Sequence, residues 1–260
     1  MPKLIITADD CGLTEAINQE AGELHQRGYI SAASVMTNYP AYEHALALFR
    51  ARPELDLGIH LSLTDGHPVS GQNEPHPHLL DEDFSFRGNL SLYMRSHFFS
   101  ASAAAWIRNE LDAQLRRFTD AGLAPRHIST HHHFHSIPLL RRIVHEMAKE
   151  HRVIWVRAHD FRANVSPHNF LLRRQRQLEN GAFNMPDYVM AIQACMNLSV
   201  ADFCARITRL SGTIEIVVHP APRDDPDFPA DWHYGIAPRR AETRFLIQAI
   251  DRLRDLGIIG

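Results

Sequence analysis

The sequence predicts an α/β fold built on a parallel sheet and contained in one domain. Short apolar runs typical of buried strands alternate with segments of helical periodicity, which is the pattern of a parallel sheet covered by helices. The 260 residues suffice for one α/β barrel or two small domains, and no linker, repeat or low-complexity segment divides them. We therefore expect a single domain over residues 1–260, with the sheet either closed as a barrel or open and doubly wound.

The first quarter of the chain alternates strands and helices clearly. Residues 4–6, Leu-Ile-Ile, form a short apolar run that ends in polar residues, as buried strands do. Residues 14–27 carry apolar side chains at helical spacing, begin with a threonine that can cap a helix and end before Gly28, so they predict a helix. The same patterns predict a strand, a helix and a second strand, at residues 33–36, 42–50 and 57–61.

An irregular insertion is expected around residues 67–100, because its first part is rich in Pro, Gly, Asn and Asp. Beyond it, a helix opens at Pro138. The inward side chains of this helix are expected to be Leu139, Ile143, Val144 and Met147. Residues 157–200 give no clear pattern. The other expected elements are a helix, two strands, a final strand and a closing helix, at residues 102–121, 127–130, 153–156, 214–218 and 238–256.

Composition argues against several classes of protein. The formal net charge of −3 argues against a nucleic-acid-binding protein, which usually has a basic excess. No segment approaches the roughly 18 unbroken apolar residues of an integral membrane segment, and the N-terminal apolar stretch is too short for a secretory signal. The three cysteines form no C-x-x-C pair, so we expect a cytoplasmic protein without a disulfide framework.

Four of the clearest strands end in polar residues that can bind a metal or transfer protons. The first strand ends in Asp9 and Asp10, and the third carries His60 near its end. The next strand runs into His131, and the last one ends at His219. Because the C-terminal ends of parallel strands point to one face, we expect these side chains to meet. Each also has a structural interpretation, as a helix cap, a core histidine or a turn residue, so their convergence is the stronger signal.

The segment RHISTHHHFHSIP, residues 126–138, adds three adjacent imidazoles to this face. Buried imidazoles are costly unless they are solvated, hydrogen-bonded or bound to a metal, so a metal site and a polar turn both remain open. Two imidazoles and one carboxylate would leave positions on a divalent cation for water and substrate. A second carboxylate could accept a proton, so the set predicts a metal-dependent hydrolase. We interpret Cys11 as structural, because no Cys-His-Asn signature surrounds it.

The segments IITADDCGLT, GIHLSLT, HISTHHHFHSIP and VVHPA resemble, in order and spacing, the motifs of the YdjC-like carbohydrate deacetylases. That family includes chitooligosaccharide deacetylases and deacetylases associated with hopanoid biosynthesis. The resemblance implies a distorted (β/α) barrel of TIM-like type, related to the polysaccharide deacetylases. It also implies metal-dependent removal of an N-acetyl group from an N-acetylated amino sugar, with release of acetate.

The resemblance further implies a role for each polar strand end. One divalent cation, which we expect to be magnesium or zinc, would be held by Asp10, His60 and His131. Asp9 would be the general base, and His219 the general acid that protonates the leaving amine. The histidines expected to orient these ligands or line the cleft are His132, His133 and His135.

Two positions depart from the family pattern. The family commonly has Phe where Cys11 stands, which should change packing beside Asp10 more than chemistry. It commonly has an acidic residue where Ser129 stands, two positions before His131. We expect the loss of that carboxylate to weaken one contact behind the metal ligands and to alter metal preference or activity.

Substrate contacts are expected from aromatic and arginine side chains, although packing in the core or on the surface is the alternative for each. The aromatic candidates for sugar platforms are Trp155, Trp232, Phe161, Phe183, Tyr188 and Tyr234. Arg157 follows the Trp155 strand and is expected to face the cleft. Three arginines are expected on a solvated helix face or against a substrate phosphate: Arg173, Arg174 and Arg176.

Two other functions remain open at this point. The same metal centre could serve an amidase acting on a non-sugar amide, or the chain could be a non-catalytic carbohydrate-binding barrel. Asp9 and His219 speak against the second, because binding alone needs no acid–base pair. By analogy with similar proteins, we also carry a homodimer as an expectation.

Overall fold

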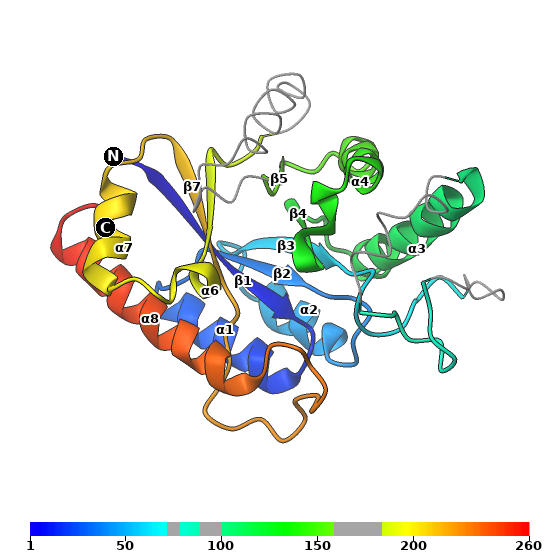
Figure 1. The fold of residues 1–260 in the computed structure, drawn as a ribbon, viewed down its shortest axis with the longest axis horizontal. Coiled ribbons are helices and arrows are strands. Elements are labelled where there is room, and N and C mark those ends of the chain that lie inside the picture. The colour runs from blue at the N-terminus through cyan, green and yellow to red at the C-terminus, as the bar shows by residue number, and fades with distance from the viewer. Residues whose placement is uncertain (72–78, 89–99, 159–183, 260) are drawn as a thin grey trace.

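The computed structural model describes residues 1–71, 79–88, 100–158 and 184–259. In these ranges, seven strands form one parallel sheet in the order β5-β4-β3-β2-β1-β7-β6, with β1 near its centre (Figure 1). All neighbouring strands are parallel, so their C-terminal ends lie on the same side of the sheet. The strands are β1 (Lys3–Cys11), β2 (Ala32–Val35), β3 (Asp56–Leu61), β4 (His127–Thr130), β5 (Trp155–Val156), β6 (Tyr188–Ala191) and β7 (Thr213–Val218).

The sheet curls into a half-barrel instead of lying open. At one edge, Asn184 forms a parallel bridge with Trp155 of β5. The Asn184 N–H donates to Ile154 O at 3.2 Å, and the Val156 N–H donates to Asn184 O at 3.0 Å. The chain then enters β6 at the opposite edge of the sheet, so this segment approaches both edges. The distorted barrel is therefore confirmed in this curled form, and the open doubly wound alternative is wrong.

Helices lie around the outside of the curled sheet (Figure 1). They are α1 (Glu15–Gln26), α2 (Tyr42–Arg50), α3 (Ala101–Asp120), α4 (Pro138–Glu150), α6 (Ile192–Cys195), α7 (Val200–Thr208) and α8 (Ile236–Asp255), and β4 runs into the 3-10 helix η3 (His131–Ser136). Their apolar faces pack on the sheet, and Phe49, Phe118 and Phe203 are among the largest fully buried side chains. Most of the buried apolar residues belong to one continuous core, which makes the barrel a rigid support for its C-terminal rim.

Local signals explain the element that follows β1. The Thr14 hydroxyl accepts a hydrogen bond from the Ile17 N–H at 3.1 Å and so caps the first turn of α1. Gly28 follows the helix with φ +74°, a left-handed conformation that favours glycine. The helix expected at residues 14–27 is therefore confirmed.

Three details differ from expectation or extend it. In α4 the buried residue of the first turn is Leu140, whereas Leu139 is only half-buried. The segment 157–200 contains β6 and α6 and ends where α7 begins. The sequence did not reveal β6 because it is four residues long and only alternate residues in it are buried. The insertion around 67–100 is irregular wherever the structure describes it, with one isolated bridge between Leu80 and Phe86.

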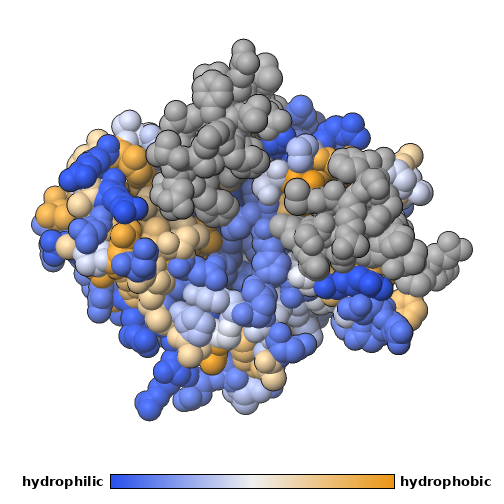
Figure 2. Space-filling model, viewed as in Figure 1, coloured by the Kyte–Doolittle hydropathy of each residue, from blue (hydrophilic) through white to orange (hydrophobic). Residues whose placement is uncertain are grey.

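The composition of the chain also gave expectations about membrane segments and cysteines. In the part of the chain that the structure describes, none of the helices combines the length and hydrophobicity that crossing a bilayer requires. Hydrophilic side chains gather across the middle of the face seen in Figure 2. All three cysteines are buried and free.

Candidate active site

The two aspartates at the end of β1 point into the same cavity, although neighbouring side chains of a regular strand point to opposite faces. The pairing of β1 with β2 is irregular between Ala8 and Cys11, and Asp10 has φ +60°. This bulge turns consecutive side chains to one side. Asp9 and Asp10 are each only 1% exposed, and both line a cavity of about 80 Å³ at the C-terminal rim of the sheet.

Asp10 lies between two histidines that come from β3 and the start of η3. Its Oδ1 is 3.3 Å from His60 Nε2 and 3.1 Å from His131 Nδ1. These three buried residues form a group whose ligand atoms lie within 4.8 Å of one another. Ligand atoms bound to one cation at about 2.0–2.1 Å lie about 3.0–3.4 Å apart, so the spacing fits a single divalent ion.

Unsatisfied atoms support the same interpretation. Asp10 Oδ1, Asp65 Oδ2 and His131 Nε2 are buried without a hydrogen-bond partner among the described residues. Buried polar atoms are normally hydrogen-bonded, but these three residues face one another only as ion pairs, at 3.1 and 3.3 Å, a spacing that a shared cation would also produce. Asp65 was not expected from the sequence; its Oδ2 lies 3.3 Å from His131 Nε2.

His131 thus lies between two carboxylates. Burial disfavours its charged form, but Asp10 and Asp65 outweigh burial and raise the pKa of His131 to about 9. Burial would raise the pKa of Asp10, yet His131 and the Arg239 guanidinium hold that pKa well below its usual value. The site therefore stabilises positive charge where a cation would bind.

Asp9 has a different set of partners. Arg157 Nη1 and Nη2 donate to Asp9 Oδ2 and Oδ1 at 2.5 and 2.9 Å, and Arg157 also donates to Glu215 Oε1. Burial would raise the pKa of Asp9, but Arg157 and then His60 hold the pKa well below its usual range. Asp9 Oδ1 is 3.9 Å from His60 Nδ1, so the ionised carboxylate lies beside the candidate metal ligands.

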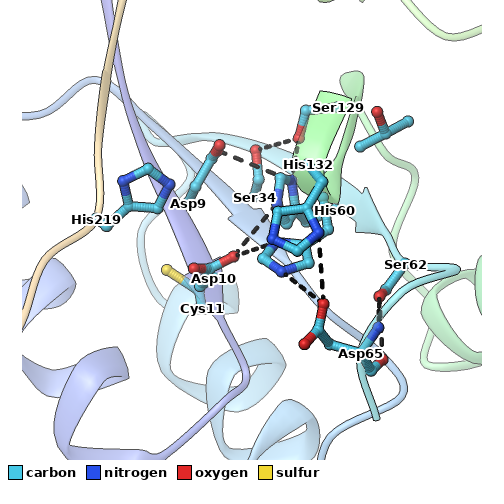
Figure 3. Close-up of polar contacts among 12 residues, drawn as sticks. Asp9, Asp10, Cys11, Ser34, His60, Ser62, Asp65, Ser129, His132 and His219 are labelled. Atoms are coloured by element: carbon cyan, nitrogen blue, oxygen red, sulfur yellow. Dashed lines mark hydrogen bonds and ion pairs between the residues drawn. The ribbon is translucent and has the colours of Figure 1, made fainter. Parts of the chain in front are cut away.

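His219, just after β7, completes the polar face of the cavity. Its Nδ1 is 3.3 Å from Glu242 Oε1, and its backbone N–H donates to Glu242 Oε2 at 3.0 Å. Burial lowers the stability of the imidazolium, but the Glu242 carboxylate outweighs burial and raises the pKa of His219. Figure 3 shows His219 beside Asp9, on the opposite side of Asp10 from Asp65.

The histidine run makes a strained turn. His132 and His133 both have φ +51°, which is uncommon for residues other than glycine. His132 and His133 line the cavity, and His132 Nε2 lies 2.8 Å from His233 Nε2. His135 does not line the cavity; it is 1% exposed and contacts Thr130 Oγ1 through Nδ1.

The other predicted substrate residues lie in different surroundings. Arg157 is fully buried against Asp9 and does not line the cavity. Trp155 is 5% exposed and stacks on His127 near the opposite end of the strands. Trp232 is nearer, with its ring centroid 5.3 Å from that of His131. Tyr234 lines the cavity, whereas Tyr188 lies in β6 and does not. The expectations for Phe161, Phe183, Arg173, Arg174 and Arg176 fall outside the described residues.

Cys11 is fully buried, and its Sγ donates to Ala8 O at 3.7 Å. Burial, with the nearby Asp9 and Asp10 carboxylates, raises the pKa of the Cys11 thiol well above its usual value. A protonated, enclosed thiol is a poor nucleophile. The environment of Cys11 therefore agrees with a structural role.

The sequence also concealed two charged residues of α8 at the site. Arg239 contacts Asp10 Oδ2 through Nη2, and Glu242 contacts His219. Both are at most 1% exposed. One signal in the sequence could have indicated them. The two charged residues are three positions apart and so share one face of the helix, and charged residues on a packed face are rarely buried without a partner.

A curled parallel barrel with a carboxylate–imidazole cluster at its C-terminal rim, beside a further aspartate and histidine, has the arrangement of a hydrolase-type site. The YdjC-like protein family model matches residues 3–254. The chain therefore belongs to the YdjC-like family.

Several relatives are named carbohydrate deacetylases. The protein from Brevibacillus brevis is 41% identical over 151 residues, which are 58% of this chain and 57% of that protein. The protein from Geobacillus stearothermophilus is 36% identical over 154 residues, or 59% of each chain. The alignments thus span less than two thirds of these relatives.

A solved structure is similar over almost the whole chain. It is a protein of Enterococcus faecalis named for cellobiose-phosphate cleavage, with a TM-score of 0.76 and 25% sequence identity. The match covers 98% of this chain and 94% of that one. The half-barrel fold is therefore shared along the full length.

Proposed function

We propose that this protein is a metal-dependent carbohydrate deacetylase that removes the N-acetyl group from an N-acetylated amino sugar and releases acetate. The observation that carries the proposal is the convergence of Asp10, His60 and His131 beside Asp9 and His219 in one cavity. The family match and the names of the relatives support the same reaction.

Asp10, His60 and His131 would hold one divalent cation, magnesium or zinc. When bound, such an ion polarises the amide carbonyl and makes a coordinated water more acidic. Two nitrogen ligands favour zinc or another transition ion, while the carboxylates suit magnesium as well. The orphaned Asp10 Oδ1 supports this ligand set, because a cation would satisfy it.

Asp9 would accept the proton of the attacking water. Its hydrogen bonds with Arg157 fix the carboxylate in its ionised form beside His60. Because Arg157 stabilises that ionised form, Asp9 would be a weak base on its own. In this proposal Arg157 supports Asp9 and does not bind the sugar.

His219 would donate a proton to the departing amine. Glu242 stabilises the imidazolium and raises the pKa of His219, so His219 keeps its proton to a higher pH than an ordinary histidine does. The pKa of Asp9 is lowered and the pKa of His219 is raised although both side chains line the same cavity, which is the division expected for a base and an acid.

A second cavity next to the site offers room for the sugar. It has a volume of about 400 Å³ and is lined by Tyr39 and Trp232, whose rings are 5.3 Å apart in an edge-to-face arrangement. Asp65 borders this cavity and also contacts His131, so the two cavities adjoin. Aromatic faces and carboxylate acceptors suit the apolar faces and hydroxyl groups of a sugar, and we assign the sugar-platform role to Trp232 rather than Trp155.

The test is acetate release from N-acetylglucosamine oligomers, with and without a chelator. We expect release that stops on chelation and returns with a divalent cation, and that is absent in His131→Ala. Folding of this variant is checked by circular dichroism. Turnover that persists in folded His131→Ala would refute the ligand assignment. Release confined to non-sugar amides would favour the amidase alternative, and sugar binding without any release would favour the binding barrel.

A further inference from the structure

His60 is connected, through its second ring nitrogen, to a chain of buried polar side chains. His60 Nδ1 lies 2.7 Å from Ser129 Oγ, and Ser129 Oγ donates to Ser34 Oγ at 2.9 Å (Figure 3). Ser34 Oγ lies 2.9 Å from His127 Nε2, and His127 Nδ1 lies 2.7 Å from Asp56 Oδ1. Ser34, His127 and Ser129 have no exposed surface.

The strand geometry shows how this chain is accommodated inside the barrel. Asp56, Gly58 and His60 occupy alternate positions of β3 and so point to one face. A Cβ on Gly58 would lie 2.4 Å from the His127 ring. Because Gly58 has no side chain, the His127 ring of β4 can cross β3 and reach Ser34 of β2.

Asp56, the last residue of this series of hydrogen-bonded side chains, is itself held by two contacts. Its Oδ2 accepts a hydrogen bond from Trp155 Nε1 at 3.1 Å, while its Oδ1 faces His127 Nδ1. The Trp155 ring stacks on the His127 ring, with 4.2 Å between centroids and 16° between planes. This arrangement gives Trp155 a role far from the sugar cavity, as support for the Asp56–His127 pair.

The available protons determine which group donates in each hydrogen bond between Asp56 and His60. An ionised carboxylate only accepts hydrogen bonds, so a His127 ring with a single proton carries it on Nδ1, toward Asp56, and accepts at Nε2. The Ser34 hydroxyl then donates to His127, and Ser34 can only accept from Ser129. With its own proton given to Ser34, Ser129 accepts from His60 Nδ1–H. An alternative acceptor for Ser129, Ile59 O, lies at 3.5 Å and is too distant to compete well.

We propose that Asp56, His127, Ser34 and Ser129 act as a positioning relay that fixes His60 in its Nδ1–H form and presents a bare Nε2 toward Asp10. The inference rests on the proposed function in one respect, that His60 binds the cation. The family commonly has an acidic residue at position 129, and here the relay provides a carboxylate from the far end of β3 instead. A carboxylate that orients a metal-binding histidine raises its affinity for the ion.

The first test reads the tautomer of His60 in the metal-free wild-type protein. Long-range ¹H–¹⁵N correlation spectra of ¹⁵N-histidine-labelled protein distinguish Nδ1–H from Nε2–H, and His60→Gln identifies the signal. We expect Nδ1–H in the wild type. Without the relay, the nearby Asp10 carboxylate should draw the proton to Nε2, so we expect Nε2–H in Ser129→Ala. Nε2–H in the wild type would overturn the inference.

The second test measures the affinity for Zn²⁺ by calorimetry with chelator competition, and needs no substrate. We expect Ser129→Ala and Ser34→Ala each to weaken binding by about 10-fold or more. Ser129→Asp should restore affinity, and adding Ser34→Ala to Ser129→Asp should then cost little, because the relay is no longer needed. Thr37→Val is the matched control: this buried hydroxyl donates to Gln114 O at 2.9 Å and lies outside the relay.

The outcomes separate the two proposals. If wild-type protein binds no Zn²⁺ at this site, the metal centre of the proposed function is wrong, and the tautomer measurement still decides the relay. If the wild type binds Zn²⁺ and Ser34→Ala binds it equally well, the relay is wrong and the metal centre stands. A loss of affinity as large in Thr37→Val as in Ser34→Ala would also contradict the relay.

Discussion

Arg157 and Asp9 form a buried ion pair with two hydrogen bonds, and neither side chain is more than 1% exposed. The same guanidinium donates to Glu215, which also accepts from Thr7 Oγ1 at 2.9 Å. One arginine therefore pairs with two carboxylates in the interior of the barrel. This arrangement makes the ion pair important both for the fold and for the position of Asp9.

Replacing Arg157 should destabilise the protein strongly. We expect Arg157→Met to lower the free energy of unfolding by about 3–5 kcal/mol at neutral pH, because it leaves Asp9 and Glu215 buried without their cation. Urea unfolding at pH 7 measures this change. Arg157→Lys is the matched control, since it keeps the charge, and it should cost less. Equal losses in the two variants would contradict the electrostatic explanation.

The same pair predicts a dependence of stability on pH. The folded-state pKa of Asp9 lies below its ordinary value of 3.8, so its contribution to stability is present above that value and is lost as the pH falls below it. The stability difference between wild type and Arg157→Met should therefore narrow below about pH 4. A difference that stays constant from pH 7 to pH 3 would argue against an ionised, stabilised Asp9.

Glu242 should control the alkaline limit of activity. Its carboxylate raises the pKa of His219, and a general acid must be protonated to act, so activity falls as the pH rises through that pKa. Glu242→Gln should shift this limb of the kcat/KM profile to lower pH. At acid pH, where His219 is protonated in both proteins, the variant should recover much of the wild-type rate. An unshifted limb would mean that another group sets it.

Binding of a cation should release protons from the ligand set. Without a cation the pKa of His131 is about 9, so at pH 7.5 this residue carries a proton that a metal ligand cannot keep. Burial lowers the pKa of His60, which is already neutral at that pH. We expect about one proton released per Zn²⁺ at pH 7.5, falling toward zero above pH 9. Calorimetry in buffers of different ionisation enthalpy measures the number, and no release would contradict a charged His131.

The raised pKa of His131 also affects the metal-free fold. A raised folded-state pKa contributes stability that is fully present below the ordinary value of 6.5 and is lost as the pH rises through about 9. Metal-free protein should therefore lose stability between these values, while protein saturated with Zn²⁺ should not. Thermal unfolding between pH 6 and 10, with and without Zn²⁺, measures the difference, and parallel curves would contradict it.

Much of the site could be predicted because its side chains stand where buried strands end. Asp10, His60 and His131 follow β-strand patterns that the sequence shows clearly, and parallel topology brings such ends together. Arg239 and Glu242 lie in the first two turns of the long helix α8, where sequence alone does not say which face packs on the barrel. Only the structure shows that α8 brings Arg239 to Asp10 and Glu242 to His219.

The errors have a similar cause. Trp155 and Arg157 were expected at the cleft because Trp155 belongs to a strand and Arg157 follows its end. Residues at different heights along the barrel axis, however, contact different groups. Trp155 lies at the level of Asp56, whereas the side chain of Arg157 turns inward beneath Asp9. Because β5 has only two residues, the sequence does not show how high along the barrel axis they lie. The register with β4 fixes that height, since His127 pairs with Trp155.

The charge of the proposed sugar cavity predicts a preference among substrates. Four carboxylates line the cavity: Asp65, Asp83, Asp227 and Asp231. They should repel an anionic substrate, so we expect a higher KM for a 6-phosphorylated N-acetylglucosamine dimer than for the neutral dimer, with kcat less affected. Added salt should reduce the difference in KM, because it screens exposed charges.

Asp83 and Asp227 are exposed, so the double variant Asp83→Asn, Asp227→Asn should fold normally and narrow the difference in KM between the two substrates. Kinetics with both dimers at low and high ionic strength test this, and equal KM values for the two dimers at low salt would show that the phosphate does not meet these aspartates.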